Sequence, residues 1–398
     1  MSATMTRRSR RHALAGAALL AVAAAAVGCS SPQDAASGDK NAPVKVGLVY
    51  SQSGALASYG KQYKEGFTAG LAYATNGTGK VNGRTVEITE ADDAGDPNKA
   101  VSAAKDMIGK GVKILAGSTA SGVALQVAPI AAQNKVLFIS GPAATDGVTG
   151  INRYTFRSGR QSYQDVLTAK SFAGDATGKK VLVFAQDSAF GKANEAAVKA
   201  VIGGAGATVS SVLVPATATD FTPSAAQAKN AKADLIFVAW AGTTASAMWQ
   251  ALDQQGVLGS TQVVTGLDQK STWPTFGAAG GKISFLSHFF EGAVDNPVAK
   301  AAREKVGGSL DLFHPDGFTA AQLVVRAIAE GGDDVEKQIK ALEGYSFDGV
   351  KGKLTVRAED HAMLQPMFQV KFGSGGQPEL VKALEPQECA PPAAAMKS

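Results

Sequence analysis

The fold is decided by residues 44–60, which carry the sequence VKVGLVYSQSGALASYG. The opening run, VKVGLVY, is apolar apart from one lysine, as is typical of a strand that is buried on both faces of a sheet. A short loop follows, and Tyr59 then begins an Ala-rich stretch, expected to be a helix over 59–74. A buried strand that leads through a short loop into a helix is typical of a parallel sheet.

The same alternation continues along the chain and restarts after residue 157. Before that point we expect strands at 44–50, 85–90, 112–116 and 136–140, with helices at 59–74, 98–110 and 121–134. After it we expect strands at 180–185, 209–214, 235–239 and 262–265, with helices at 163–173, 192–203, 225–230 and 244–255. Further helices are expected at 297–306, 319–330 and 335–343. Two such halves without a long linker predict an α/β protein with two doubly wound parallel-sheet lobes and a ligand cleft.

The N-terminal segment is typical of an export signal that ends at a lipid attachment site. Four arginines between residues 7 and 11 precede an apolar run over 13–27, which is shorter than the roughly 20 residues needed to span a bilayer. The following sequence, AVGC over 26–29, resembles a bacterial lipobox, although Ala26 stands where leucine is commoner. We expect a signal peptide over 1–28, lipid on Cys29 and a polar tether over 29–43. Residues 9–11 (SRR) also resemble a twin-arginine signal, so the export route stays open.

The charge and the cysteines exclude some functions. The formal net charge is +5, but the four signal arginines supply most of it, so the remaining chain is close to neutral. This balance argues against a nucleic-acid partner. The chain has two cysteines, and if Cys29 carries lipid, Cys389 has no partner within the chain. Cys389 falls in a Pro/Ala-rich tail that we expect to be disordered over 386–398. The most that this cysteine suggests is an occasional intermolecular disulfide.

Four loops after the expected strands of the first half carry a family resemblance. They are SGALASYG at 53–60, DDAGDP at 92–97, GSTASG at 117–122 and SGPAAT at 140–145. In this order they resemble the type I periplasmic binding proteins, specifically the leucine/isoleucine/valine-binding branch of ABC transporters, over roughly 44–372.

This resemblance implies a fold and a mode of action. The first lobe would comprise 44–157 and 288–358, and the second 158–287 and 359–385, joined by crossovers near 157–159, 284–290 and 358–362. A monomer of this kind would capture a small molecule between the lobes and deliver it to a membrane permease, without a cofactor.

The candidate site residues suit a carboxylate and an ammonium group. Ser121 begins an expected helix, whose N-terminus attracts an anion. An ordinary serine N-cap is the other interpretation of that position, and both can hold at once. Thr145 offers a second hydroxyl and Ala143 its backbone polar groups, and the resembled family holds the amino-acid carboxylate and part of the ammonium at these positions. Asp268 follows a strand where the family has an acid, usually glutamate, for the α-amino group. A solvated loop aspartate is the alternative for Asp268.

Aromatic residues would line the rest of the pocket. Tyr59 falls at its mouth, Phe190 stands where the family often has tyrosine, and Trp240 either lines the pocket or belongs to the core. We expect a branched-chain or similarly apolar amino acid as ligand. The alternatives are an aromatic acid, an amide or another small carboxylate on the same scaffold, or a ligand sensor that takes no part in transport.

Signals for other chemistry are weak. The sequence GDATGKK at 174–180 has one spacer too few for a P-loop and precedes a strand instead of following one. No G-x-S-x-G motif is present, and the three histidines after the signal lack metal-ligand spacing. The aspartates at 92, 93 and 96 fit a turn before Pro97 better than a metal site. We therefore expect no enzyme activity, no metal and no cofactor.

Overall fold

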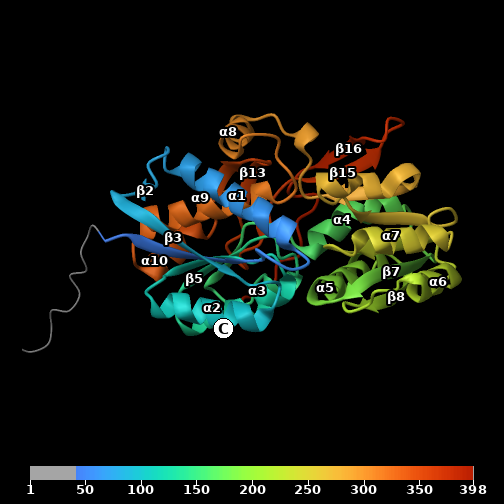
Figure 1. Ribbon diagram of the computed structural model, residues 1–398, viewed down its shortest axis with the longest axis horizontal. Coiled ribbons are helices and arrows are strands. Elements are labelled where there is room, and N and C mark those ends of the chain that lie inside the picture. Colours follow the sequence, from blue (N-terminus) through green and yellow to red (C-terminus); the bar gives the residue numbers. More distant parts are fainter. Residues whose placement is uncertain (1–41, 398) are drawn as a thin grey trace, which may run out of the picture. The chain divides into compact units, whose positions relative to one another are not determined.

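Two large sheets form the framework of residues 42–397, the part of the chain that this computed structural model describes (Figure 1). Strand order in the first sheet is β2 (Lys80–Val81), β3 (Arg84–Asp92), β1 (Val44–Tyr50), β4 (Ile114–Gly117), β5 (Leu137–Ser140) and β6 (Thr155–Arg157). Except for β2, these strands are parallel.

The second sheet contains strands from two separate parts of the chain. Its order is β16 (Pro378–Leu384), β15 (Met367–Phe372), β11 (Ile283–Ser287), β10 (Gln262–Gly266), β9 (Leu235–Ala239), β7 (Lys180–Asp187) and β8 (Thr208–Pro215). Strands β7 to β11 are parallel, whereas β15 and β16 add an antiparallel edge that the sequence did not predict. A small third sheet comprises β12 (Ser346–Gly349), β13 (Gly352–Val356) and β14 (Met363–Leu364). The predicted α/β class with two parallel-sheet lobes is confirmed.

Helices cover both faces of the first sheet, because successive apolar side chains of a strand point to opposite sides. In β4, Ile114 packs with the cluster of α1 (Ala57–Ala74), α9 (His314–Gly331) and α10 (Val335–Leu342). The next residue, Leu115, packs with α2 (Pro97–Gly109) and α3 (Ser121–Gln133). Figure 1 shows these two helix layers, and α8 (Pro297–Val306) packs beside α1.

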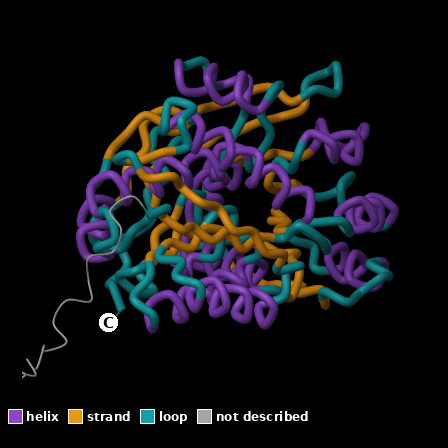
Figure 2. The backbone as a smooth tube through the Cα atoms, turned by 60° about the vertical axis from the view of Figure 1, so that its left-hand side comes forward, coloured by secondary structure: helices purple, strands orange, loops and turns teal. Residues whose placement is uncertain are grey.

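The second sheet is covered in the same way, and Figure 2 shows strands between helices. Phe237 of β9 packs with α4 (Ser162–Ala173), α5 (Ala189–Val198) and its π-helical continuation η2 (Lys199–Gly203). Its neighbour Val238 packs with α6 (Thr222–Asn230), α7 (Ala245–Gln254) and the 3-10 segment η3 (Lys270–Lys282). Two further 3-10 turns are η1 (Asp146–Val148) and η4 (Glu291–Ala293). Each sheet with its helices forms one lobe, called here the first and the second lobe.

Close packing of α1 on α9 sets the position of the site. A Cβ atom on Gly317 would lie 1.9 Å from the Tyr63 carbonyl oxygen, and one on Gly66 would lie 2.0 Å from the His314 carbonyl oxygen. Only glycine lets the two backbones approach so closely. Helix α9 also begins one turn before the predicted start at 319, with Pro315 in its first turn, and this brings Asp316 into the interior.

The C-terminal tail was predicted to be disordered, and this prediction was wrong for its described residues. The Cys389 side chain is fully buried beside Met367 and Leu384, and its thiol lies 3.3 Å from the Gln365 carbonyl oxygen. Arg357 donates hydrogen bonds to the carbonyl oxygens of Pro391 and Pro392. The Pro/Ala composition suggested disorder. The segment is nevertheless held in place through its own backbone carbonyl oxygens, and any residue type supplies these acceptors.

The segment that carries the expected lipid site lies outside the described residues, and so does Cys29. Within residues 42–397, no helix combines the length and the apolar character that crossing a membrane requires.

Candidate functional site

A cavity of about 370 Å³ is lined by loops that follow the strands of both lobes. Thr119 and Ser121 follow β4, and Pro142 and Ala144 follow β5, on the first lobe. Gln186, Trp240, Asp268 and His288 stand at or just beyond the ends of β7, β9, β10 and β11 on the second lobe. Open parallel sheets bind ligands beyond the carboxyl ends of their strands. The cavity therefore lies where the strand pattern predicted a site.

Ser121 is the first residue of α3 and lines the cavity. Its hydroxyl oxygen accepts a hydrogen bond from the Thr145 backbone N–H at 3.2 Å, which leaves the hydroxyl hydrogen free to be donated. The N-cap residue, Ala120, has no side chain that could satisfy the first N–H groups, and no acid lies in the first turn. This helix end therefore offers donors and a positive dipole end to an anion.

Ala143 and Thr145 lie behind this wall and are not among the residues that line the cavity. Their carbonyl oxygens accept hydrogen bonds from the buried Arg157 guanidinium, at 2.6 Å for Ala143 and 2.8 Å for Thr145. The Thr145 hydroxyl accepts from the Gly147 N–H at 3.3 Å. The polar atoms expected to face a ligand thus hold the loop 140–145 in place, and Pro142 and Ala144 form its cavity surface.

Asp268 lines the cavity from the second lobe and is joined to the first lobe by Tyr59. The Tyr59 hydroxyl donates to Asp268 Oδ1 at 2.6 Å, and the Gln269 N–H donates to the same oxygen at 2.8 Å. The Tyr59 hydroxyl also accepts from the Gly242 N–H at 3.3 Å. Burial raises the pKa of the Asp268 carboxyl, and the hydrogen bond from Tyr59 opposes that rise. The two lobes are therefore in direct contact across the cavity.

Aromatic and apolar side chains make up much of the remaining wall. Phe190 lines the cavity from the first turn of α5, which begins earlier than the sequence predicted. Trp240 also lines it, with its indole N–H donating to the Thr244 hydroxyl at 3.0 Å and its ring 5.8 Å from that of Phe184. Phe313 adds a third ring, 4.5 Å from Tyr59. Trp240 is thus both a wall residue and part of the core.

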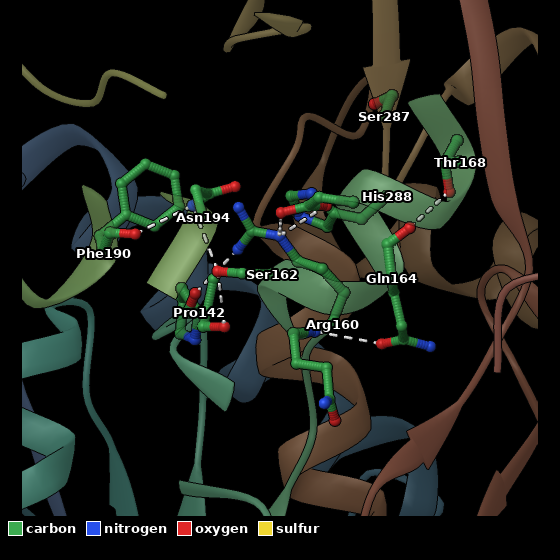
Figure 3. Close-up of polar contacts among 12 residues, drawn as sticks. Pro142, Arg160, Ser162, Gln164, Thr168, Phe190, Asn194, Ser287 and His288 are labelled. Carbon is green, nitrogen blue, oxygen red and sulfur yellow. Dashed lines mark hydrogen bonds and ion pairs between the residues drawn. The ribbon is translucent and has the colours of Figure 1, made fainter. Parts of the chain in front are cut away.

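Sequence reasoning missed three titratable residues of the cavity wall, Arg160, Asp165 and His288. Arg160 Nε lies 3.3 Å from Asp165 Oδ2. Its Nη1 donates to the Pro142 carbonyl oxygen at 2.9 Å (Figure 3). Burial raises the pKa of Asp165 to about 6, although the Arg160 charge opposes the rise. Burial, with Arg160 close by, lowers the pKa of His288 well below its usual value, so this imidazole is neutral at pH 7.

The position of Arg160 was visible in the sequence, because it directly follows the expected crossover at 157–159. The direction in which its side chain points could not be predicted, because it depends on partners in α4 and in the loop 140–145. Figure 3 also shows Asn194, whose amide donates to the Ser162 hydroxyl at 3.2 Å and to the Phe190 carbonyl oxygen at 3.0 Å. These bonds fix the Phe190 turn against α4.

The acidic loop 92–97 is explained by turn and cap hydrogen bonds. Asp96 is the N-cap of α2 and accepts from the Asn98 N–H at 2.8 Å. Asp92 accepts from the Ser53 hydroxyl and from the backbone N–H groups of Ala94, Gln52 and Ser53, and these hydrogen bonds lower the pKa of its carboxyl to about 2. The predicted turn before Pro97 is present.

The sequence and the fold both match known proteins. The family model of the periplasmic binding proteins matches residues 43–377. The Leu/Ile/Val-binding protein BraC3 of Rhizobium johnstonii is 26% identical over 345 residues, 84% of this chain and 93% of the relative. An ABC-type branched-chain amino acid transporter protein from Rhodopseudomonas palustris has a crystal structure with a TM-score of 0.71 and 32% identity. That match covers 89% of this chain and all of that one.

A second solved structure has a different ligand. It is a solute-binding protein of an ABC transporter from Rhodopseudomonas palustris, in complex with p-hydroxybenzoic acid, with a TM-score of 0.78 and 26% identity. The match covers 86% of this chain and 97% of that one. The chain therefore belongs to the periplasmic binding protein family of exported solute-binding proteins, within the branch of the branched-chain amino-acid ABC transporters.

Proposed function

We propose that this protein captures an amino acid with an apolar side chain outside the cytoplasm and delivers it to an ABC importer. The observation that carries the proposal is the pairing of two opposite polar features on one cavity. The N-terminus of α3, with Ser121, faces the cavity from the first lobe, and the Asp268 carboxyl faces it from the second. Together they complement the carboxylate and the ammonium of a zwitterion.

Selectivity follows from the cost of leaving a buried polar group without a partner. A ligand without an ammonium leaves Asp268 facing an apolar group, and one without a carboxylate leaves the α3 N-terminus uncompensated. Phe190, Trp240 and Phe313 supply the apolar surface for the side chain. In this proposal Ala143 and Thr145 act indirectly, by holding the loop and the Ser121 hydroxyl in position.

Closure of the lobes on the ligand is the proposed capture step. Hinge closure is general among periplasmic binding proteins. Tyr59 supports it here, because its hydroxyl joins Asp268 and Gly242 on the second lobe to α1 on the first. We propose that 44–157 with 288–358, and 158–287 with 359–385, move as the two rigid parts.

An aromatic carboxylate is the second candidate ligand. Five aromatic side chains line the cavity, those of Tyr59, Phe190, Phe237, Trp240 and Phe313, and Arg160 gives it a cation for a carboxylate. The relative in complex with p-hydroxybenzoic acid shows that this fold accepts such a ligand. An aromatic acid would require Asp268 to be protonated or satisfied by Tyr59 and Gln269 alone.

Isothermal titration calorimetry with leucine, phenylalanine, benzoate and 4-hydroxybenzoate separates the two candidates. If the amino-acid proposal holds, leucine or phenylalanine binds, and Ser121→Ala and Asp268→Ala weaken binding. Asp175→Ala is the matched control, because Asp175 lies on the surface away from the cavity and should leave binding unchanged. Binding of benzoate without any amino acid would replace the first candidate by the second.

We further propose that the chain is a lipoprotein, attached through Cys29 to the outer face of the cytoplasmic membrane or facing the periplasm. Replacement of Cys29 by serine should release the protein from the membrane fraction, and mass spectrometry should find an acylated N-terminal cysteine in the natural protein. The proposed partner is a membrane permease, with the protein as a monomer. A permease and an ATPase encoded beside it would support transport over ligand sensing.

A further inference from the structure

Arg160 is held in the cavity wall by contacts of two nitrogen atoms of its guanidinium group, Nε and Nη1. Its Nε lies 3.4 Å from Asp165 Oδ1 and 3.3 Å from Oδ2, and Nη1 donates to the Pro142 carbonyl oxygen at 2.9 Å. The Arg160 carbonyl oxygen in turn accepts from Arg157 Nη2 at 2.6 Å. Both the backbone and the side chain of Arg160 are therefore fixed before any ligand arrives.

The guanidinium group of Arg160 has further N–H donors that these contacts do not use. An arginine has five N–H groups, and the contacts with Asp165 and Pro142 use only one on Nε and one on Nη1. Within residues 42–397, Arg160 Nη2 has no hydrogen-bond partner. Unlike Arg157 Nε, it is not among the fully buried polar atoms that lack a partner, so it is accessible. The Arg160 side chain is 11% exposed and lines the cavity, so these donors are available to a bound molecule.

The same loop supports Arg160 and the α3 N-terminus. Arg160 is bonded to Pro142, and Ser121 accepts from Thr145, three residues further along that loop. Ser121 can donate one hydroxyl hydrogen, whereas a carboxylate has two oxygens to satisfy. Planar, preorganised N–H groups such as those of Arg160 are well suited to carboxylate recognition.

We propose that Arg160 donates hydrogen bonds to the ligand's carboxylate and makes the site selective for acids over their amides. Asp165 is a positioning residue that holds the guanidinium group by Nε. This inference rests on the proposed function, because it assumes that a carboxylate ligand occupies the cavity, and it applies equally to an amino acid and to an aromatic acid.

The test compares acids with their amides on the full chain by calorimetry. The probes are leucine, phenylalanine and 4-hydroxybenzoate, each paired with its primary amide. The main variant is the double substitution Arg160→Gln/Asp165→Asn, which removes both charges and leaves no buried acid without its cation. The control is Arg153→Gln/Glu336→Gln, which removes an arginine–carboxylate pair of 2.5 Å whose side chains are half exposed on the surface.

The double variant should lose roughly 30-fold or more in affinity for the acid, as expected when a buried charged hydrogen bond is removed. Its affinity for the amide should stay the same, so the preference for the acid disappears. The surface control should bind like the natural protein. Arg160→Lys keeps the charge but not the planar group, and it should lose part of the affinity for the acid if the double variant does not fold.

Three outcomes contradict the inference. If the folded double variant or Arg160→Lys binds the acid as tightly as the natural protein, Arg160 does not contact the carboxylate, and the proposed function stands. If affinities for acid and amide fall equally, Arg160 only supports the loop at Pro142. If the natural protein binds none of the acids, the proposed function fails and the inference fails with it.

Discussion

Removing the Tyr59 hydroxyl should weaken ligand binding by destabilising the closed arrangement of the lobes. In Tyr59→Phe the ring keeps its packing against Phe313, but Asp268 Oδ1 loses a donor at 2.6 Å. A distance of 2.6 Å is in the range of a charge-assisted O–H···O⁻ hydrogen bond. The Gly242 N–H, 3.3 Å from the same hydroxyl, loses its acceptor as well.

The size of the effect follows from these two contacts. A hydrogen bond to a charged group contributes about 1.5–3 kcal/mol, and it exists only while the lobes are in contact. We therefore expect the closed form to lose about 2 kcal/mol relative to the open form. At 25 °C this corresponds to an affinity roughly 30-fold lower.

Calorimetric titration with the carboxylate that binds most tightly measures this change. Tyr63→Phe is the matched control, since Tyr63 lies one turn further along α1, is fully buried, and its hydroxyl bonds to no side chain within residues 42–397. A double-mutant cycle of Tyr59→Phe with Asp268→Asn should return a coupling of similar size. Equal affinities for Tyr59→Phe, Tyr63→Phe and the natural protein would refute the role of this contact in closure.

Three further predictions concern stability and reactivity. Because burial raises the pKa of Asp165 to about 6 and the unfolded chain loses this proton near pH 3.9, the free energy of unfolding should fall by about 2 kcal/mol as the pH rises from 4 to 6. Urea titrations at several pH values should show this fall in stability in the natural protein and not in Asp165→Asn. Gly317→Ala should lower the free energy of unfolding by about 1–3 kcal/mol or more, because its new methyl group would collide with the backbone of α1. Gly109 has open space around it, so Gly109→Ala should be neutral or slightly stabilising in thermal unfolding. Burial raises the pKa of the Cys389 thiol to about 12, so in a Cys29→Ser background Ellman's reagent should find no reactive thiol until guanidinium unfolds the protein.

Local patterns predicted the central elements of both lobes because their causes are local. Strand β1 occupies the predicted residues, Val44–Tyr50, since a valine-rich run in a parallel sheet is buried on both faces. The antiparallel strands β15 and β16 escaped prediction. Five consecutive residues of β16 are exposed, and an edge strand buried on so little of its surface gives no clear hydrophobic pattern.

Part of the candidate site could likewise be expected from local patterns in the sequence. Ser121, Asp268 and Tyr59 directly follow strands or begin a helix, so their place could be read from the order of elements, and all three line the cavity. Arg157 decides where the polar atoms of Ala143 and Thr145 point, and it lies 12 to 14 residues further along the chain. Arg160 likewise takes its direction from Pro142, 18 residues earlier. Such long-range contacts leave no periodic signal in the sequence.

The ordered C-terminal tail has a practical consequence for observing the protein at work. From Cys389 on the second lobe, the chain passes Asp360, which accepts from the Ala394 N–H, and reaches Gly150 on the first lobe, which accepts from the Lys397 N–H. The last described residues, 394–397, thus lie beside Asp360 and Gly150. An environment-sensitive fluorophore at exposed Ala395 would lie on the first lobe, although the preceding residues of the tail pack on the second, and so would report the proposed closure without entering the cavity.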